Sequence, residues 1–506
     1  MNFKEKVLEY FSLDESQLIE YLKPLEELDY GSPSDFIDMD KAVTLVTESI
    51  ENDYKTMIYG DYDADGIMAT SIIINLYAKF NKTPGYYIPS RTIDGYGINL
   101  DRAKQIVAKG YKLVITVDNG VSQFEALSYL KENGVKVLLT DHHAFGEEVA
   151  PHDVFIHPFK KNRVEENCGA YVAYMLAEAV LKRRDDYLLS LASLATVSDL
   201  MPLNLHNRNI IRLGLNYINN TSDHPFRYLY SGEFDAEVFS FQIAPKINAF
   251  GRVIEDTSIN TIIGLFTNTN ISKKYEISSQ IEHINSIRKN MVNVVSNTQI
   301  IYDNEAVIVF DPSLKEGIVG LVCNKYLNQY KKPCIVLTKA EDDVIKGSAR
   351  SINGTPLNEF FEQEKDLFLT CGGHANAGGL SLNINNLADL IEKFNKFVKD
   401  HPYKIELPRY IEIDREDLTI ENLNFLKSFA PFGIGFEEPT FKIKLSKNDV
   451  YFQNNLLKGN INSITSLIMF NAINIELNDV NELYGKIKKD TYKNGFISFM
   501  VSAINL

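Results

Sequence analysis

The amino-acid sequence predicts an α/β multidomain protein with a parallel-sheet domain, a long connecting helix, a smaller α/β domain and a C-terminal β-barrel. Three observations support this prediction. From about residue 55, short apolar runs alternate with helical patterns, as in parallel sheets whose strands are joined by helices. Residues 270–300 carry apolar side chains at spacings of three, four and seven, which indicates one long amphipathic helix. After about residue 403, many short strand-like runs are typical of a small barrel.

The first 50 residues are predicted to form an acidic helical arm. Six apolar residues recur there at helical spacing: Val7, Leu8, Phe11, Leu18, Ile19 and Leu22. Residues 1–56 contain 5 Lys and 14 Asp or Glu, so they carry −9 of the chain's formal charge of −15. Because phosphate binding depends on clustered Lys and Arg, the overall charge argues against a protein that coats nucleic acid without specificity. Residues 441–506 hold 8 Lys and 5 acidic residues, a net charge of +3 that permits a short strand-binding path.

Each of three predicted strands is followed directly by a polar cluster. KTMIYG leads into DYDADG, KLVITV leads into DNG, and VKVLLT leads into DHH. The carboxyl ends of parallel strands meet at one edge of a sheet, where open α/β sheets place their sites. We therefore expect these clusters to lie close together.

The acidic clusters predict a site for divalent cations. Hard cations prefer carboxylate oxygens, Asp and His together suit Mn²⁺ or Mg²⁺, and no cysteine is placed to contribute a thiolate. The candidate ligands are Asp61, Asp63, Asp65, Asp118, His142 and Asp199. This number is enough for two ions, the usual arrangement for phosphoester hydrolysis. Two other interpretations of DYDADG are a solvated acidic turn and an EF-hand loop, which would require a glutamate where this chain has Ile72.

A phosphate substrate would need cationic and backbone donors, and several segments offer them. The candidates are Arg91 in PSRTIDGYG, Arg252 in NAFGR, Ser348 and Arg350 in GSARS, and His374 in GGHANAGG. Arginine binds phosphate oxygens through two parallel hydrogen bonds, and glycines let backbone N–H groups approach closely. The sequence has no GxSxG motif, so it does not indicate a nucleophilic serine hydrolase.

A second α/β unit is expected after the connecting helix. Its strands are AVIVFD, PCIVLTK and VIKGSARS, and its helix runs through GIVGLVCNKYL. In the last part of the chain, IEI, TFKIKL and GFISFMVSAI are expected strands of the barrel. KSFAPFGIGFEEP is expected to be rich in loops.

The protein is predicted to be soluble and cytoplasmic. Its four cysteines are scattered without a CxxC pattern, which fits a reducing compartment: Cys168, Cys323, Cys334 and Cys371. The N-terminus lacks the continuous apolar segment of a signal peptide, and no apolar run is long enough to span a membrane.

The motifs, in this order and spacing, resemble those of the DHH phosphoesterases. DYDADG, VDNG, DHH and VSDLMPL match the four motifs of that family, and GGHANAGG matches its companion domain, DHHA1. INAFGR, KEGIVGLVCNKYL, IKGSARS and APFGIGFEEP are similar to the bacterial RecJ single-strand-specific exonucleases. After the acidic arm at 1–50, the resemblance implies a DHH catalytic domain at 51–225, a helical connector at 226–302, a DHHA1 domain at 303–402 and an OB-fold-like nucleic-acid-binding domain at 403–506.

The resemblance to RecJ implies hydrolysis of single-stranded DNA from its 5′ end to mononucleotides, in DNA repair and recombination. Two divalent cations are implied, Mn²⁺ before Mg²⁺. The implied ligand sets are Asp63 and Asp118 for one ion, and Asp65, Asp118, His142 and Asp199 for the other. Asp61 stands where relatives carry a histidine ligand.

The remaining candidate residues take their implied roles from the same resemblance. His143 would face the scissile phosphate, Asp141 would orient the histidines, and His374 would lie near the scissile group. Four residues resemble the pocket that anchors the 5′ phosphate: Arg91, Arg252, Ser348 and Arg350. A helicase and a single-strand binding protein are candidate partners of an enzyme expected to be monomeric and not bound to membranes.

One motif departs from the family pattern, and two other functions stay open. Where RecJ proteins have PFGxGNPxP, this chain has Phe436 and Glu437 in place of Asn and Pro, a change that bears on strand affinity rather than on cleavage. A DHH/DHHA1 phosphodiesterase of short oligonucleotides or cyclic dinucleotides would share the DHH and DHHA1 domains. A binding or scaffold protein would keep the fold but lose metal ligands, whereas every candidate ligand position is filled here.

Overall fold

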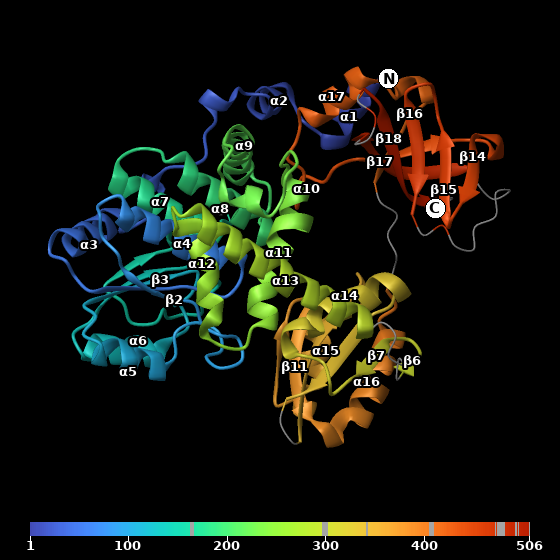
Figure 1. The fold of residues 1–506 in the computed structure, drawn as a ribbon. Helices are drawn as coiled ribbons and strands as arrows, with labels where there is room; N and C mark the ends of the chain where they lie inside the picture. Colours follow the sequence, from blue (N-terminus) through green and yellow to red (C-terminus); the bar gives the residue numbers. More distant parts are fainter. Residues whose placement is uncertain are drawn as a thin grey trace. The chain divides into compact units, whose positions relative to one another are not determined.

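The computed structural model describes residues 1–161, 166–295, 302–340, 343–403, 409–470, 472, 481–490, 493 and 495–504. The chain divides into two units (Figure 1). The central unit comprises Ser32–Asp199 and Tyr217–Ile405, and the terminal unit comprises Met1–Gly31, Leu200–Asn216 and Glu406–Leu506. The terminal unit therefore brings together segments from both ends of the chain.

A five-stranded parallel sheet forms the first half of the central unit, in the order β2-β1-β3-β4-β5. Its strands are β1 (Thr56–Tyr59), β2 (Gly85–Tyr87), β3 (Leu113–Val117), β4 (Lys136–Thr140) and β5 (Val154–Ile156). One face is covered by α5 (Leu100–Ala108) and α6 (Phe124–Glu132), and the other by α3 (Met39–Glu51), α4 (Ala64–Ala78) and α7 (Gly169–Leu181) (Figure 1). Because both faces are covered, β1 and β3 are buried at every position. The predicted parallel α/β fold is confirmed.

Helices follow this sheet along the chain. They are α8 (Asp186–Ser198), α9 (Leu205–Asn220), α10 (Ala236–Val238), α11 (Ala244–Val253), α12 (Ile263–Thr267) and α13 (Ile271–Val295). The long helix α13 confirms the prediction, and Ile277, Ile281 and Ile284 are buried on it as their spacing requires. Residues 296–300, the end of the predicted helix, lie outside the described part. Among the described residues, no helix combines the length and the apolar character needed to cross a bilayer.

The second half of the central unit is a smaller α/β fold around a six-stranded mixed sheet, ordered β10-β11-β9-β8-β7-β6. Its strands are β6 (Tyr302–Asp303), β7 (Val307–Phe310), β8 (Cys334–Lys339), β9 (Val344–Arg350), β10 (Thr370–Gly373) and β11 (Ala377–Asn383). Its helices are α14 (Glu316–Tyr330), α15 (Leu357–Gln363) and α16 (Leu387–Asp400). The glycines of GGHANAGG pair across the β10–β11 hairpin, with Gly372 opposite Gly379.

The terminal unit contains a seven-stranded sheet in the order β12-β13-β17-β18-β16-β15-β14. Its strands are β12 (Tyr410–Glu412), β13 (Thr440–Lys444), β14 (Val450–Gln453), β15 (Leu456–Asn460), β16 (Thr465–Met469), β17 (Glu482–Lys489) and β18 (Ile497–Ile504). The helix α17 (Ile420–Lys427) ends at the start of the segment that the sequence predicts to be rich in loops. The strand-rich C-terminal region is confirmed, whereas an OB-type barrel stays a prediction.

The N-terminal arm is helical, as predicted, and packs within the terminal unit. It consists of α1 (Phe3–Phe11) and α2 (Glu15–Tyr21). Phe11 stacks on Phe432 and Phe436, with ring planes 7° and 13° from parallel. Two arm lysines form ion pairs with acids of the C-terminal region: Lys4 with Glu421, and Lys6 with Asp417. Ile19 and Leu22, which the helical spacing places on the apolar face, are exposed.

A buried arginine holds three segments of the terminal unit together. The side chain of Arg208, from α9, is fully buried and donates from Nη1 to the carbonyl oxygens of Phe429 (2.6 Å) and Pro431 (2.9 Å). Its guanidinium lies 4.6 Å from the ring centroid of Tyr21 and 5.2 Å from that of Phe436. Burial lowers the pKa of Arg208 to about 9. Phe436, which departs from the family pattern, is therefore a ring partner of both the arm and this arginine.

Replacing Arg208 with alanine should loosen the arm. The substitution leaves two buried carbonyl groups without their donor and opens a cavity between aromatic rings, so we expect the free energy of unfolding to fall by about 3 kcal/mol. Hydrogen exchange in residues 1–31 and thermal unfolding would measure the effect. The exposed Arg409, which donates to the Glu9 carbonyl, provides the control. An Arg409→Ala variant as unstable as Arg208→Ala would contradict the role given to Arg208.

Candidate metal centre

Polar side chains gather at the carboxyl edge of the parallel sheet. Asp61 follows β1, and Asp63 caps α4 by accepting a hydrogen bond from the Gly66 amide at 3.1 Å. Asp118 follows β3 with a left-handed backbone, φ 62°. The DHH tripeptide, Asp141 to His143, follows β4. The convergence expected from the three strand–loop units is therefore present.

All six candidate ligands lie in three overlapping groups, together with His143. Within each group, one ligand atom from every residue lies within 4.8 Å of the others. The groups are Asp61, Asp63 and Asp118; Asp65, His142 and Asp199; and Asp118, His142 and His143. Asp118 and His142 each belong to two groups, so the clusters form one continuous site.

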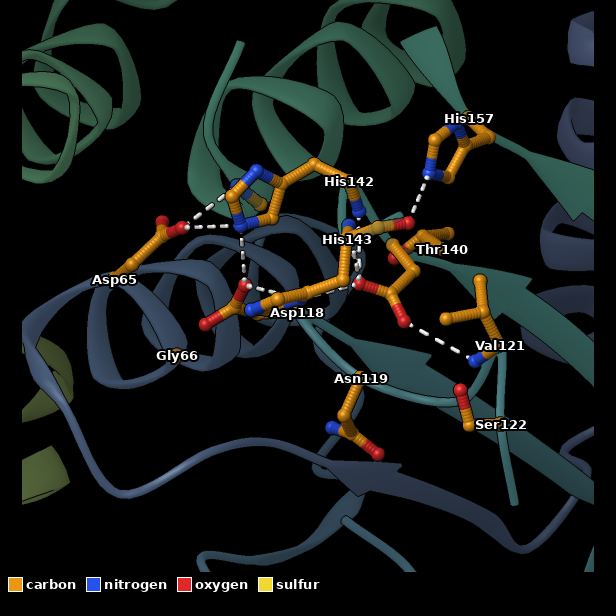
Figure 2. Close-up of polar contacts among 12 residues, drawn as sticks. Asp65, Gly66, Asp118, Asn119, Val121, Ser122, Thr140, His142, His143 and His157 are labelled. Carbon is orange, nitrogen blue, oxygen red and sulfur yellow. Dashed lines mark hydrogen bonds and ion pairs between the residues drawn. The ribbon is translucent and has the colours of Figure 1, made fainter. Parts of the chain in front are cut away.

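His142 occupies the middle of the carboxylates (Figure 2). Its Nε2 atom lies 3.2 Å from Asp118 Oδ1, 3.5 Å from Asp199 Oδ2 and 3.6 Å from Asp65 Oδ2. None of these contacts has the geometry of a hydrogen bond, and Nε2 is buried without a hydrogen-bond partner among the described residues. A nitrogen lone pair aimed at three carboxylates suits a shared cation better than a proton.

The N-terminus of α7 holds Asp65 in place. The backbone N–H groups of Gly169 and Ala170 each donate to one of its carboxylate oxygens, both at 2.7 Å. A helix N-terminus stabilises a negative charge at this position. A Cβ atom at Gly169 would lie only 2.6 Å from Asp118 Oδ1, so this close approach requires glycine.

Asp141 organises the DHH tripeptide rather than contributing to a ligand group. Its Oδ1 accepts from the amides of His142 (2.8 Å) and His143 (3.1 Å), and its Oδ2 accepts from the amide of Val121 (3.1 Å). Asp141 Oδ1 also lies 2.8 Å from His143 Nδ1. Burial alone would lower the pKa of His143, but the hydrogen bond and charge of Asp141 outweigh it and raise that pKa to about 9.

Burial and mutual repulsion raise the pKa of the clustered carboxyl groups. Burial contributes most to the raised pKa of Asp61, Asp63 and Asp118, and the charges of neighbouring aspartates raise it further. The same two causes raise the pKa of Asp199 to about 8. Oδ1 of Asp61 and Oδ1 of Asp118 are buried without hydrogen-bond partners in the described part of the chain. This donor set fits divalent cations, because a cation would favour the ionised carboxylates and satisfy their free oxygens.

The phosphate-binding candidates form two pairs. The Arg91 guanidinium stacks 4.2 Å from the Tyr62 ring centroid, and its Nε atom has no hydrogen-bond partner among the described residues. A Cβ added at Gly251, the residue before Arg252, would lie 2.4 Å from the Tyr62 carbonyl oxygen, so Arg252 follows a residue packed against the tyrosine on which Arg91 stacks. Burial and the charge of Arg91 lower the pKa of Arg252 to about 10. Ser348 and Arg350 lie on β9; an added Cβ at Gly320 would meet both side chains within 3.3 Å.

Helix α14 lies between the two pairs: it contacts Arg252 of α11, and its Gly320 faces Ser348 and Arg350. Arg252 Nη1 donates to the Gly317 carbonyl oxygen at 3.2 Å. His374 lies on the turn of the exposed β10–β11 hairpin, and none of its described contacts reaches the carboxylates. The contacts thus connect Arg252 with α14, which also meets Ser348 and Arg350, and the structure gives no contact between His374 and the described metal ligands.

Several residues around the centre were not found from the sequence. Tyr96 Oη lies 3.1 Å from His143 Nδ1 and donates to the Asp118 carbonyl oxygen at 3.2 Å. Asn248 accepts from the Ala64 amide at 2.7 Å and so ties α11 to the start of α4. His157 contacts the His143 backbone. Tyr96 and Asn248 lie inside motifs that the sequence marks for their arginines, PSRTIDGYG and NAFGR, whereas no pattern marks His157.

Comparison with known proteins shows which domains this chain contains and which proteins it resembles. The DHH family, N-terminal domain, matches residues 55–198, and the DHHA1 domain matches residues 303–400. The single-stranded-DNA-specific exonuclease RecJ of Bacillus subtilis (strain 168) is 31% identical over 429 residues, which cover 81% of this chain and 54% of that protein. The chain therefore contains a DHH domain and a DHHA1 domain and is similar to RecJ exonucleases over most of its length.

Solved RecJ structures have the same fold. The crystal structure of RecJ in complex with Mn²⁺ from Thermus thermophilus has a TM-score of 0.85 at 22% identity, covering 99% of this chain and 75% of that one. A crystal structure of exonuclease RecJ bound to manganese has a TM-score of 0.62 at 26% identity, covering 72% of this chain and 96% of that one. The chain spans about half the length of the Bacillus subtilis RecJ.

The metal-free protein should lose stability as the pH rises. A carboxyl group whose pKa is about 8 in the folded protein, against an ordinary 3.8, binds more protons when folded. The contribution of Asp199 to stability is therefore present below pH 4 and is lost as the pH rises to about 8. We expect Mn²⁺ to reverse this loss. Melting temperatures between pH 5 and pH 8, with chelator or with Mn²⁺, test the expectation.

An Asp199→Asn variant should remove part of this pH dependence. Asp101, an exposed residue in the first turn of α5, supplies the control, since Asp101→Asn should leave the dependence unchanged. A metal-free protein whose melting temperature rises over this range would show that the carboxylates do not repel one another in the folded state.

A methyl group at Gly169 should damage the metal centre. In Gly169→Ala the new Cβ would displace Asp118, or the α7 amides that hold Asp65, and we expect Mn²⁺ affinity to fall at least about tenfold. Titration of the purified protein with Mn²⁺ measures the affinity. Gly146, where an added Cβ meets nothing within 4 Å, gives the matched control. Equal Mn²⁺ affinity in both alanine variants would rule out this role for Gly169.

Proposed function

We propose that this protein is a metal-dependent exonuclease that hydrolyses single-stranded DNA from its 5′ end to mononucleotides. The observation that carries the proposal is the convergence of the six candidate ligands into groups with ligand atoms within 4.8 Å, with the Arg91 cation stacked on Tyr62 between Asp61 and Asp63. A carboxylate centre next to an anion site is what phosphodiester cleavage at a chain end requires. The RecJ relatives, which are named as single-stranded-DNA-specific exonucleases, support this substrate class.

The ligands would hold two divalent cations, with Mn²⁺ preferred over Mg²⁺. Asp63 and Asp118 would bind one ion, and the set Asp65, Asp118, His142 and Asp199 would bind the other, with Asp61 beside the first. When bound, the cations would supply Lewis acidity that lowers the pKa of water and neutralises charge on the phosphate. The raised pKa values of the clustered carboxyl groups support this assignment, since they describe a site that needs positive charge.

The chain's own residues would orient and neutralise the scissile phosphate. His143, protonated and held by Asp141, presents a cationic imidazole beside Asp118, where it would hydrogen-bond a phosphate oxygen. Arg91, Arg252, Ser348 and Arg350 would bind the 5′ phosphate and thereby set the distance from the chain end to the cleaved bond. His374 is proposed to approach the scissile group only with substrate present.

The proposals on cellular role, oligomeric state, partners and domains rest on the similarity to RecJ proteins. We propose that the protein acts in DNA repair and recombination, as a monomer in the cytoplasm, with a helicase and a single-strand binding protein as partners. We also propose the five domains given above, with the C-terminal strands as an OB-like module that guides the strand.

An end-labelled substrate set tests the proposed activity. With Mn²⁺, the purified chain should release mononucleotides from 5′-phosphorylated single-stranded DNA labelled at its 5′ end, and should leave blunt duplex DNA intact. If it cuts only dinucleotides or cyclic dinucleotides, the exonuclease proposal is wrong and the phosphodiesterase alternative holds. His142→Ala should abolish turnover and still fold, because the carboxylates remain supported by the strand ends and by α7. Arg350→Ala should instead raise KM and weaken the preference for a 5′ phosphate.

A further inference from the structure

Both backbone polar groups of His143 form hydrogen bonds with side chains, and these two side chains follow different strands. On the N–H side, Asp141 Oδ1 accepts the His143 amide at 3.1 Å. On the C=O side, His157 Nε2 lies 3.0 Å from the His143 carbonyl oxygen (Figure 2). Asp141 follows the last residue of β4, whereas His157 follows β5, the edge strand beside it. The DHH tripeptide is therefore fixed from two sides, by one residue inside it and one outside it.

The hydrogen bonds of His157 define its tautomer. The backbone amide of Phe159 donates to His157 Nδ1 at 3.1 Å, so Nδ1 carries a lone pair. The ring proton must then lie on Nε2, which donates to the His143 carbonyl oxygen. Both ring nitrogens are used in this way, and the side chain is almost completely buried. This imidazole is therefore not available to bind a ligand or exchange a proton with solvent.

Packing prevents the ring from turning away. Phe145, Phe155 and Phe159 surround it, with ring centroids 5.0–5.3 Å from that of His157. Phe145 itself lies two residues after His143 and meets the His157 ring edge-on, at 89°. Because the ring cannot rotate, its Nε2 donor is a fixed point against which the His143 carbonyl is set.

We propose that His157 is a positioning residue for the DHH tripeptide: its Nε2–H holds the His143 carbonyl and so fixes where His142 and His143 present their rings to cations and to a scissile phosphate. The inference rests on the proposed function for its catalytic consequence but not for its consequence on metal binding. The His142 ring follows the same backbone, and its Nε2 lies within 3.6 Å of three candidate ligands. A rotation of the His142–His143 backbone would move that atom out of the group.

Three substitutions at His157 separate positioning from packing. Glutamine can place an amide donor where Nε2 was, asparagine can replace only the Nδ1 acceptor, and phenylalanine fills the volume with neither. We expect His157→Gln to bind Mn²⁺ within about threefold of the wild type, and His157→Asn and His157→Phe to bind it about 10–100-fold more weakly. The probe is Mn²⁺ alone, followed by the electron paramagnetic resonance signal of the free ion, with melting temperatures measured in parallel.

His152 supplies a matched control. It also lies against Phe155, with ring centroids 5.4 Å apart, but its Nδ1 contacts the Ala150 carbonyl oxygen and not the DHH tripeptide. His152→Phe should keep the wild-type Mn²⁺ affinity. On 5′-phosphorylated single-stranded DNA, His157→Phe should lower kcat with little change in KM, since the 5′-phosphate residues are untouched.

The outcomes are distinct. If a folded His157→Phe protein binds Mn²⁺ like the wild type, or if glutamine and phenylalanine impair binding equally, His157 does not position the tripeptide. If His157→Phe does not fold, His157→Gln is compared with His157→Asn instead, and equal Mn²⁺ affinities of these two variants would overturn the proposal. Failure of the wild type to degrade DNA would overturn the proposed function but not this inference, because the order of Mn²⁺ affinities is measured without DNA.

Discussion

Repulsion among buried carboxylates is the constraint on which the rest of the central unit depends. Two unit charges 4 Å apart repel by about 4 kcal/mol at an effective dielectric constant of about 20, and this site holds five aspartates in overlapping groups. The chain can fold around such a cluster only by fixing the backbone at several points. The carboxyl ends of β1, β3 and β4 provide three of them, and the N-terminus of α7 provides a fourth through its bonds to Asp65. Each support is backbone structure, which does not depend on the protonation of a side chain.

Hydrogen bonds around the cluster divide it into two kinds of side chain. Asp65 and Asp141 have their oxygens occupied by backbone amides, so their positions are set before any cation arrives. Asp61, Asp118 and His142 keep atoms that have no hydrogen-bond partner among the described residues. The first kind of residue gives the site its shape, and the second kind gives it its affinity. Preorganisation of this sort lowers the entropy lost when a cation binds.

Local sequence patterns were sufficient to predict the strands and helices whose apolar residues follow a regular spacing. Strands β1, β3 and β4 and the long helix α13 follow from apolar runs and helical spacing, and five of the six candidate ligands follow because polar residues after parallel strands must meet at one edge. Asp199 follows helix α8 instead, so this rule does not place it. Contacts between distant segments could not be found in this way. Gly169 contacts Asp65 across 104 residues, and His157 is a lone histidine whose partner is a backbone atom. The GGHANAGG hairpin is a related case: its glycines alone do not specify a hairpin, which depends on the pairing of β11 with β10 and with β9.

The net charge of a sequence segment says less about its surface than the ion pairs that its charged residues form. Residues 441–506 have a net charge of +3, yet three of their lysines are committed to glutamates: Lys442 to Glu482, Lys444 to Glu412 and Lys488 to Glu438. The acidic arm, conversely, uses two of its few lysines to pair with acids of the same unit. Lys444 and Lys488 pair with glutamates outside residues 441–506, so the C-terminal strands present a weaker positive field than their composition suggests. The two arm lysines pair with acids outside the arm and therefore do not neutralise the arm's own acids. Recognition of a DNA strand by the terminal unit would therefore depend on exposed aromatic side chains such as Tyr451 and Phe470 as well as on charge.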